Sequence, residues 1–158
     1  MSFSIRFARP EDADIVLALI RALAEYEREP DAVEVDAATL ASQLREPTPP
    51  FECLLAEREG ETVGLALFFH TYSTWRGKRG IHLEDLFVVP AARGAGIGEA
   101  LLREVARIAR SRGCARLEWS VLDWNEPALA FYRALGARPL SEWVLHRVDG
   151  DALTALAR

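Results

Sequence analysis

The segment that most constrains the fold of this chain is a glycine-rich turn between an apolar strand and an amphipathic helix. A strand predicted at residues 81–89 is followed by glycines at positions 94, 96 and 98, and then by a helix predicted at 99–112. Glycine permits positive φ and lets a ligand approach closely. Successive N–H groups then point into one hollow at the helix N-terminus, which binds phosphate through unpaired donors and the helix dipole. We therefore expect an anion site here, with Arg93 as a forked cation at its rim.

Three phosphate-binding patterns compete for this turn. A P-loop would end in Gly-Lys-Ser/Thr, whereas Gly98 is followed here by Glu99 and an alanine. A Rossmann turn requires its last glycine where Glu99 stands, and the candidate ribose-binding acid, Glu118, lies inside a predicted strand and not at its end. The third pattern, Arg/Gln-x-x-Gly-x-Gly/Ala, is matched by Arg93, Gly96 and Gly98. For the hexapeptide alone, a glycine-rich helix entry without a ligand remains the alternative.

Hydrophobic periodicity predicts the strands and helices on either side of this turn. Alternation and short apolar runs predict strands at residues 4–8, 51–57, 62–71, 81–89, 115–122 and 143–148. Helical spacing and capping residues predict helices at 10–27, 36–44, 99–112 and 125–136, and a short one from 149. Hairpin-linked strands come first and βαβ crossovers follow. We expect one α/β domain over residues 1–158, a mixed, mostly antiparallel sheet of six to seven strands with helices on both faces.

Composition narrows the classes of partner. Acidic residues outnumber basic ones by 24 to 19, which argues against a nucleic-acid binder, since such a protein normally carries a basic stripe. No run of eighteen apolar residues is present and the N-terminus lacks a signal-peptide layout, so we expect no membrane partner and a cytoplasmic location. Cys53 and Cys114 are expected to be reduced, buried thiols. The three histidines show no ligand spacing, so we expect no metal.

Further motifs stand in order along the chain. Residues 83–89 precede the glycine turn, and residues 121–126, Phe131-Tyr132 and residues 135–137 follow it. Together with the turn they resemble the GNAT-type N-acetyltransferases over nearly the whole chain, which implies a single GNAT-like domain. Residues 24–27 and 71–75 resemble in particular the diamine (spermidine/spermine) acetyltransferase branch. Within that branch, Ser73-Thr74-Trp75 and residues 122–125 are most similar to the thialysine N-acetyltransferase members.

The resemblance implies acetyl-CoA as co-substrate, bound by one loop and one strand. A bulge or splay in that strand would free backbone groups for the pantetheine arm. Asn125 is expected to cap its helix and also to bond that arm. The remaining cofactor-binding residues implied by the resemblance are Leu86, Phe87 and Val88 on the strand, and Arg93, Gly94, Ala95, Gly96, Ile97, Gly98 and Glu99 in the turn.

Direct transfer requires two proton movements. An aliphatic amine has a pKa of about 10.4 and arrives protonated. By resemblance, Glu84 accepts that proton through water, and Tyr132 gives a proton to the CoA sulfur. Strand alternation predicts that Glu84 and Asp85 point to opposite faces. The alternatives are a carboxylate paired with a neighbouring cation for Glu84 and a core aromatic for Tyr132.

The resemblance implies an acceptor site at Tyr26, Glu27, Trp75 and Glu84. An acid with aromatic neighbours is physically suited to an ammonium. The resemblance implies a small amine: thialysine, a lysine-like amino acid, or a diamine or polyamine. An exposed helix end, for Tyr26 and Glu27, and a packed loop aromatic, for Trp75, are the plainer interpretations. A protein or peptide acceptor and a non-catalytic CoA-binding regulatory module remain alternatives. The resemblance also implies a homodimer, with residues 143–148 as a candidate interface.

Overall fold

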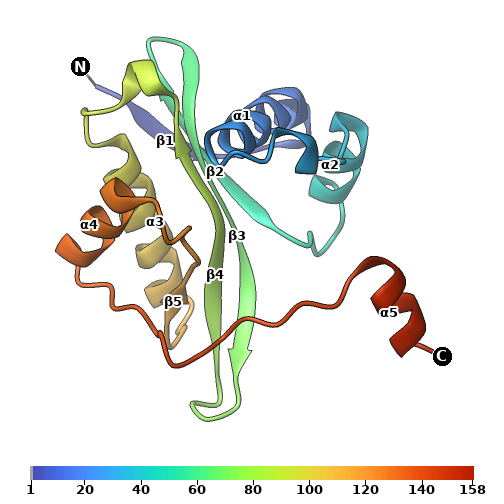
Figure 1. The fold of residues 1–158 in the computed structure, drawn as a ribbon. Coiled ribbons are helices and arrows are strands. Elements are labelled where there is room, and N and C mark those ends of the chain that lie inside the picture. Colours follow the sequence, from blue (N-terminus) through green and yellow to red (C-terminus); the bar gives the residue numbers. More distant parts are fainter. Residues whose placement is uncertain (1) are drawn as a thin grey trace. The chain divides into compact units, whose positions relative to one another are not determined.

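The strands of this protein form one mixed sheet (Figure 1). A computed structural model describes residues 2–158, and within them the strand order is β1-β2-β3-β4-β5. Neighbouring strands are antiparallel from β1 to β4, and β4 and β5 are parallel. The α/β class and the mixed, mostly antiparallel sheet are confirmed, with five strands in the described chain where six to seven were predicted. The strands are β1 Ser4–Phe7, β2 Glu52–Arg58, β3 Glu61–Ser73, β4 Lys78–Val88 and β5 Leu117–Glu118.

The helices follow the predicted order. They are α1 Ala13–Tyr26, α2 Ala37–Leu44, α3 Ile97–Ser111, α4 Glu126–Ala134 and α5 Gly150–Leu156. Among residues 2–158, none of them has the length and apolar character needed to cross a membrane. The chain divides into two compact units, one ending at Ser120 and the other comprising Val121–Arg158. The sheet and α1 to α3 belong to the first unit, and α4 and α5 to the second.

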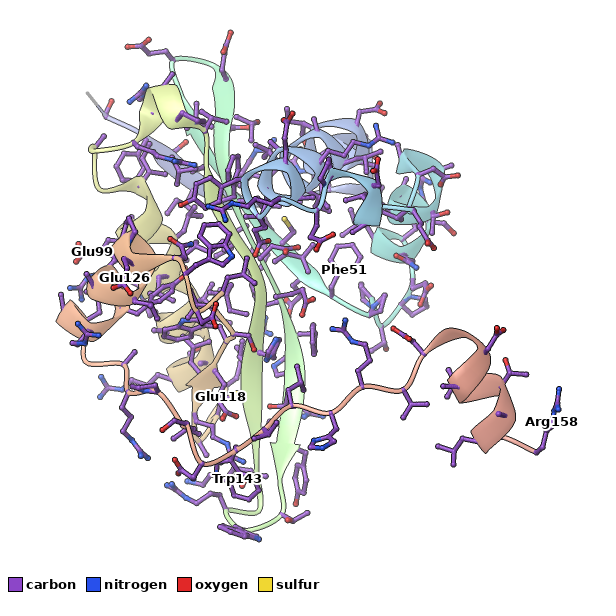
Figure 2. All side chains as sticks on the ribbon, in the orientation of Figure 1. Phe51, Glu99, Glu118, Glu126, Trp143 and Arg158 are labelled. Carbon is purple, nitrogen blue, oxygen red and sulfur yellow. The ribbon has the colours of Figure 1, made fainter. Side chains whose placement is uncertain are left out.

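Both faces of the sheet in the first unit are buried. Helices α1 and α2 cover one face, and α3 covers the other (Figure 1). The central strands therefore carry consecutive buried residues, as Leu54, Leu55, Leu65 and Ala66 do, each at most 1% exposed. Phe51, labelled in Figure 2, belongs to the cluster beneath α1 and α2. Other members of that cluster are Val16, Leu19, Leu40, Cys53, Leu55, Leu65, Leu67 and Phe87.

Two predicted strands differ from the structure. The strand expected at residues 115–122 is limited to Leu117–Glu118, and residues 143–148 form no strand. A strand needs a neighbouring edge to satisfy its backbone N–H and C=O groups. The segment 143–148 has the alternation of a strand but pairs with no strand of the described chain, and Trp143 and Leu145 are 68% and 80% exposed. Side-chain alternation alone therefore misled the prediction.

Gly64 provides a test of this packing. A Cβ built there would lie 3.0 Å from the Phe87 carbonyl oxygen and 3.3 Å from Leu101 Cδ1. We expect Gly64→Ala to lower the free energy of unfolding by about 1–3 kcal/mol, because the added carbon overpacks the contact between β3 and α3. Urea unfolding followed by circular dichroism measures the change.

Gly98→Ala is the matched control. Its added Cβ would meet Val88 Cγ2 at 3.7 Å, an ordinary contact, and alanine favours a helix over glycine by about 1 kcal/mol. Its stability should not fall. An unfolding midpoint of Gly64→Ala equal to that of the parent protein would contradict the close approach of β3 and α3.

Candidate active site

The glycine turn places a row of backbone donors at the start of α3. A 3-10 turn, Pro90–Ala92, leads out of β4, and Gly94 and Gly96 have φ values of 82° and 79°. Cβ atoms built at these two glycines would face open space. The helical ladder starts with Ala100 N–H donating to the Gly96 carbonyl, so the N–H groups of residues 97–99 have no acceptor within the helix. This geometry fits a phosphate bound by backbone groups.

Two charged side chains of the turn are engaged by the protein itself. Glu99, labelled in Figure 2, forms an ion pair with Arg103 at 2.7 Å. Arg93 Nε donates to the Val88 carbonyl at 2.9 Å, and Arg93 Cζ lies 5.1 Å from the ring centroid of Tyr26 and 5.5 Å from that of Phe87. The guanidinium of Arg93 therefore faces two aromatic rings, which the expectation of a rim cation did not foresee.

The outer edge of β4 is open beside this turn. Strand β5 pairs with β4 only at Ile81 and His82, so among the described residues no strand pairs with the last part of β4 on that side. Val89 N–H donates to the Val63 carbonyl at 2.9 Å. Because antiparallel ladders alternate, Phe87 also bonds to β3, while Leu86 and Val88 direct their backbone groups to the open edge. Of the three residues predicted to pair with the pantetheine arm, Leu86 and Val88 have the required orientation and Phe87 does not.

A β-bulge occurs in β4 at Glu84. Leu67 pairs with Asp85 and the next residue, Phe68, pairs with Leu83, so Glu84 is the extra residue. The expectation that Glu84 and Asp85 point to opposite faces is wrong, because a bulge interrupts the alternation on which it relied. Asp85 shares its register position with Leu67, a member of the cluster beneath α1 and α2.

Three carboxylates gather at this bulge. Burial, together with the charges of Glu84 and Glu27, raises the pKa of Asp85 to about 6. Burial also raises the pKa of Glu27, again with a contribution from Glu84. Glu84 itself is half exposed, and one of its carboxylate oxygens lies 3.3 Å from His82 Nε2. The charge of Glu84 thus acts on both Glu27 and Asp85, and the place of Glu27 and Glu84 in an acceptor site stays a prediction.

Asp85 is the residue that reasoning from the sequence missed. The signal was present, since two adjacent acids interrupt an otherwise apolar strand, and a buried acid requires an explanation. Because regular strand alternation places Glu84 and Asp85 on opposite faces, the sequence assigned only Glu84 to the acceptor site. A bulge, which has no sequence signature here, brings the second one in.

The other predicted acceptor residues lie in two places. Tyr26 is the last residue of α1 and Glu27 is its C-cap, close to the bulge. Trp75 lies in the turn between β3 and β4 and is 87% exposed. Glu84 is six residues along β4 from Lys78, where that turn ends, which corresponds to roughly 20 Å. Within one chain, Trp75 and the three carboxylates are therefore not brought together.

Asn125 and Tyr132 belong to the second unit. The Asn125 side chain accepts a hydrogen bond from Ala128 N–H at 3.4 Å, which makes it the predicted cap of α4. Tyr132 lies on α4 next to Phe131, with ring centroids 5.3 Å apart. These contacts describe the two residues within α4, and their roles toward acetyl-CoA stay predictions.

Cys53 does not compete with this site as a nucleophile. Burial raises the pKa of the Cys53 thiol to about 12, so it stays protonated and is no nucleophile at neutral pH. Both cysteines are free. Within residues 2–158, histidine, cysteine and acidic side chains form no group that could hold a metal ion.

The chain belongs to the Acetyltransferase (GNAT) family, whose profile matches residues 16–137. A thialysine N-epsilon-acetyltransferase of Bos taurus is 42% identical and aligns over 97% of this chain and 96% of its own. A spermidine/spermine N(1)-acetyltransferase-like protein 1 of Homo sapiens is 35% identical over 98% of this chain and 24% of its own. An integron cassette protein of V. cholerae has a solved structure with a TM-score of 0.82 and 27% identity, covering 100% of this chain and 99% of that one.

These findings confirm the resemblance that the motifs indicated. GNAT acetyltransferases use acetyl-CoA as co-substrate, and the two curated relatives described above are named for N-acetyltransferases. The prediction of an enzyme that transfers an acetyl group to an amine is therefore confirmed at that level.

The raised pKa of Asp85 predicts a pH-dependent cost in stability. Between its ordinary pKa of 3.8 and about 6, the folded protein keeps a proton that the unfolded chain has released. Stability should therefore fall as pH rises through this window, by up to about 3 kcal/mol. Asp85→Asn removes the charge, so the variant should match the parent at pH 3.5 and be more stable at pH 8. Urea unfolding at both pH values measures the difference.

Glu118→Gln serves as the control for this experiment. Glu118 forms an exposed ion pair with Arg116 at 3.2 Å, and its loss should change stability by less than about 1 kcal/mol at pH 8. Equal stability of Asp85→Asn and the parent at pH 8 would contradict the buried, crowded position of Asp85.

Proposed function

We propose that this chain moves the acetyl group of acetyl-CoA to the primary amine of a small cationic acceptor: thialysine, a lysine-like amino acid, or a diamine or polyamine. The observation that carries the proposal is the group formed by Glu84 and Asp85, on the strand that has the open edge, with Glu27 at the end of α1. A bound ammonium would offset the repulsion among these carboxylates. The relatives named for thialysine and for spermidine/spermine support the same class of acceptor.

The first unit would align the co-substrate through backbone groups. Acetyl-CoA supplies the acetyl group as a thioester. The N–H groups of residues 94–99 would bind its pyrophosphate, and the outward-facing backbone groups of Leu86 and the Val88 N–H would pair with its pantetheine arm. An N–H on this edge would also polarise the thioester carbonyl. Holding both reactants in register converts a bimolecular encounter into an effectively unimolecular step.

The acidic group would prepare the amine. Tyr26 and Glu27 line the acceptor side, and Asp85 binds the charge of the ammonium. Glu84, which is half exposed at the bulge, accepts the amine proton through water. The neutral amine then attacks the thioester carbon, and the C–S bond breaks as the hydroxyl of Tyr132 gives its proton to the departing thiolate. The second proton of the attacking nitrogen goes to the Tyr132 phenolate, which leaves a neutral amide and restores the tyrosine.

A screen of amines tests the proposed function directly. The purified protein is incubated with acetyl-CoA and thialysine, lysine, ornithine, diamines or polyamines, and thiol release is recorded. We expect release with at least one small cation and none with a neutral amide. If no amine in the set releases thiol, the small-amine function is overturned.

Glu84→Gln tests the proton acceptor. We expect kcat to fall by about 100-fold, because a positioned base contributes between 100- and 10,000-fold. Glu118→Gln, which alters an exposed pair on the neighbouring strand, should keep the activity of the parent. A variant that loses stability but keeps kcat and its pH profile would remove Glu84 from the mechanism.

Tyr132→Phe tests the proton donor. It removes one hydroxyl and keeps the ring, so packing against Phe131 should survive. We expect kcat to fall by at least about 10-fold, with the KM for both substrates within about twofold of the parent. Tyr72→Phe is the matched control, since Tyr72 is 65% exposed on β3. Unchanged acetylation by Tyr132→Phe would show that the proton reaches the thiolate by another route.

A further inference from the structure

The side chain of Arg93 joins three elements of the first unit. It leaves the turn that precedes α3, and its Nε donates to the Val88 carbonyl at the end of β4. Its guanidinium carbon lies 5.1 Å from the ring centroid of Tyr26, the last residue of α1. It lies 5.5 Å from the ring centroid of Phe87, which is buried on β4. One cation thus contacts the phosphate-binding turn, the co-substrate strand and the acceptor end of α1.

These contacts require a planar guanidinium group. Its Nε points to the strand carbonyl, and its planar surface covers aromatic rings, an arrangement that lysine cannot reproduce in full. The Val88 carbonyl lies on the open edge of β4, so the bond also satisfies a group that has no neighbouring strand. The turn, by contrast, offers the N–H groups of residues 97–99 to an anion without any help from this side chain.

We propose that Arg93 is a positioning residue of the acceptor site, which holds Tyr26 against the end of β4, and that it is not a ligand of the pyrophosphate. Anchored in the turn, Arg93 ties the acceptor end of α1 to the loop that binds the co-substrate. The inference rests on the proposed function in one respect, namely that Tyr26 borders the acceptor amine.

Arg93→Gln and Arg58→Gln form a matched pair for the test. Arg58 Nη2 contacts the Ala91 carbonyl of the same turn at 3.5 Å, so both variants remove a cation and a backbone contact at this turn. For each we would measure the Kd for CoA by calorimetry, the KM for the acceptor amine, and hydrogen exchange in the last turn of α1. Circular dichroism confirms that each variant is folded.

We expect Arg93→Gln to raise the KM for the acceptor and the exchange rate at the end of α1 by about 2- to 5-fold, the range of one cation–π contact. The Kd for CoA should change by less than about twofold, and Arg58→Gln should leave all three quantities near those of the parent. In a Tyr26→Leu background, Arg93→Gln should raise the acceptor KM no further, because its effect passes through Tyr26.

Two results would overturn the inference. One is a CoA Kd that rises at least about tenfold in Arg93→Gln with an unchanged acceptor KM, since a lost charge-assisted phosphate contact weakens CoA binding and not acceptor binding. The other is unchanged exchange at the end of α1. The exchange measurement needs no turnover, so it decides the role of Arg93 even if no amine is acetylated, a result that would remove the proposed function alone.

Discussion

The open edge of β4 is the constraint on which the rest of the site depends. A strand in the interior of a sheet normally satisfies its backbone on both sides. Here β5 pairs with only two residues of β4, and the backbone of Leu86 and Val88 is left facing outward just before the glycine turn. The strand holds this position because its own side chains are buried, Phe87 and Val88 at 5% and 9% exposure. Side-chain burial therefore keeps β4 in place, and its backbone is left for a ligand.

The bulge at Glu84 also places an acidic side chain of β4 beneath α1. By adding one residue to β4, it offsets the alternation between Leu83 and Asp85, so an acid occupies a register position that packs beneath α1. This position costs stability, because burial and the charges of Glu84 and Glu27 raise the pKa of Asp85 to about 6. Bulges are common next to active sites, where they redirect a side chain. In this protein, one extra residue is enough to bring Asp85 into the group with Glu27 and Glu84.

The sequence predicted the features that depend on local pattern. The glycine turn, the amphipathic helix after it, the Asn125 cap and the mixed sheet each follow from residue types at fixed spacing, and the structure contains them. Features that depend on partners far along the chain were missed. The contact of Arg93 with Tyr26 spans two elements, the bulge has no sequence signature, and residues 143–148 have the alternation of a strand but form none.

The loss of folding stability at Asp85 is linked to the binding of the proposed acceptor. A carboxyl group that keeps its proton up to a pH of about 6 is one whose charged form lacks a partner. A cationic amine supplies that partner, so its binding would lower the pKa of Asp85 and release a proton wherever the group is still protonated. The same crowding of carboxylates that lowers the stability of the protein without an acceptor thus strengthens its attraction for an ammonium. On the proposed function, the stability given up at the bulge is recovered when the acceptor binds, which relates the fold of β4 to the choice of substrate.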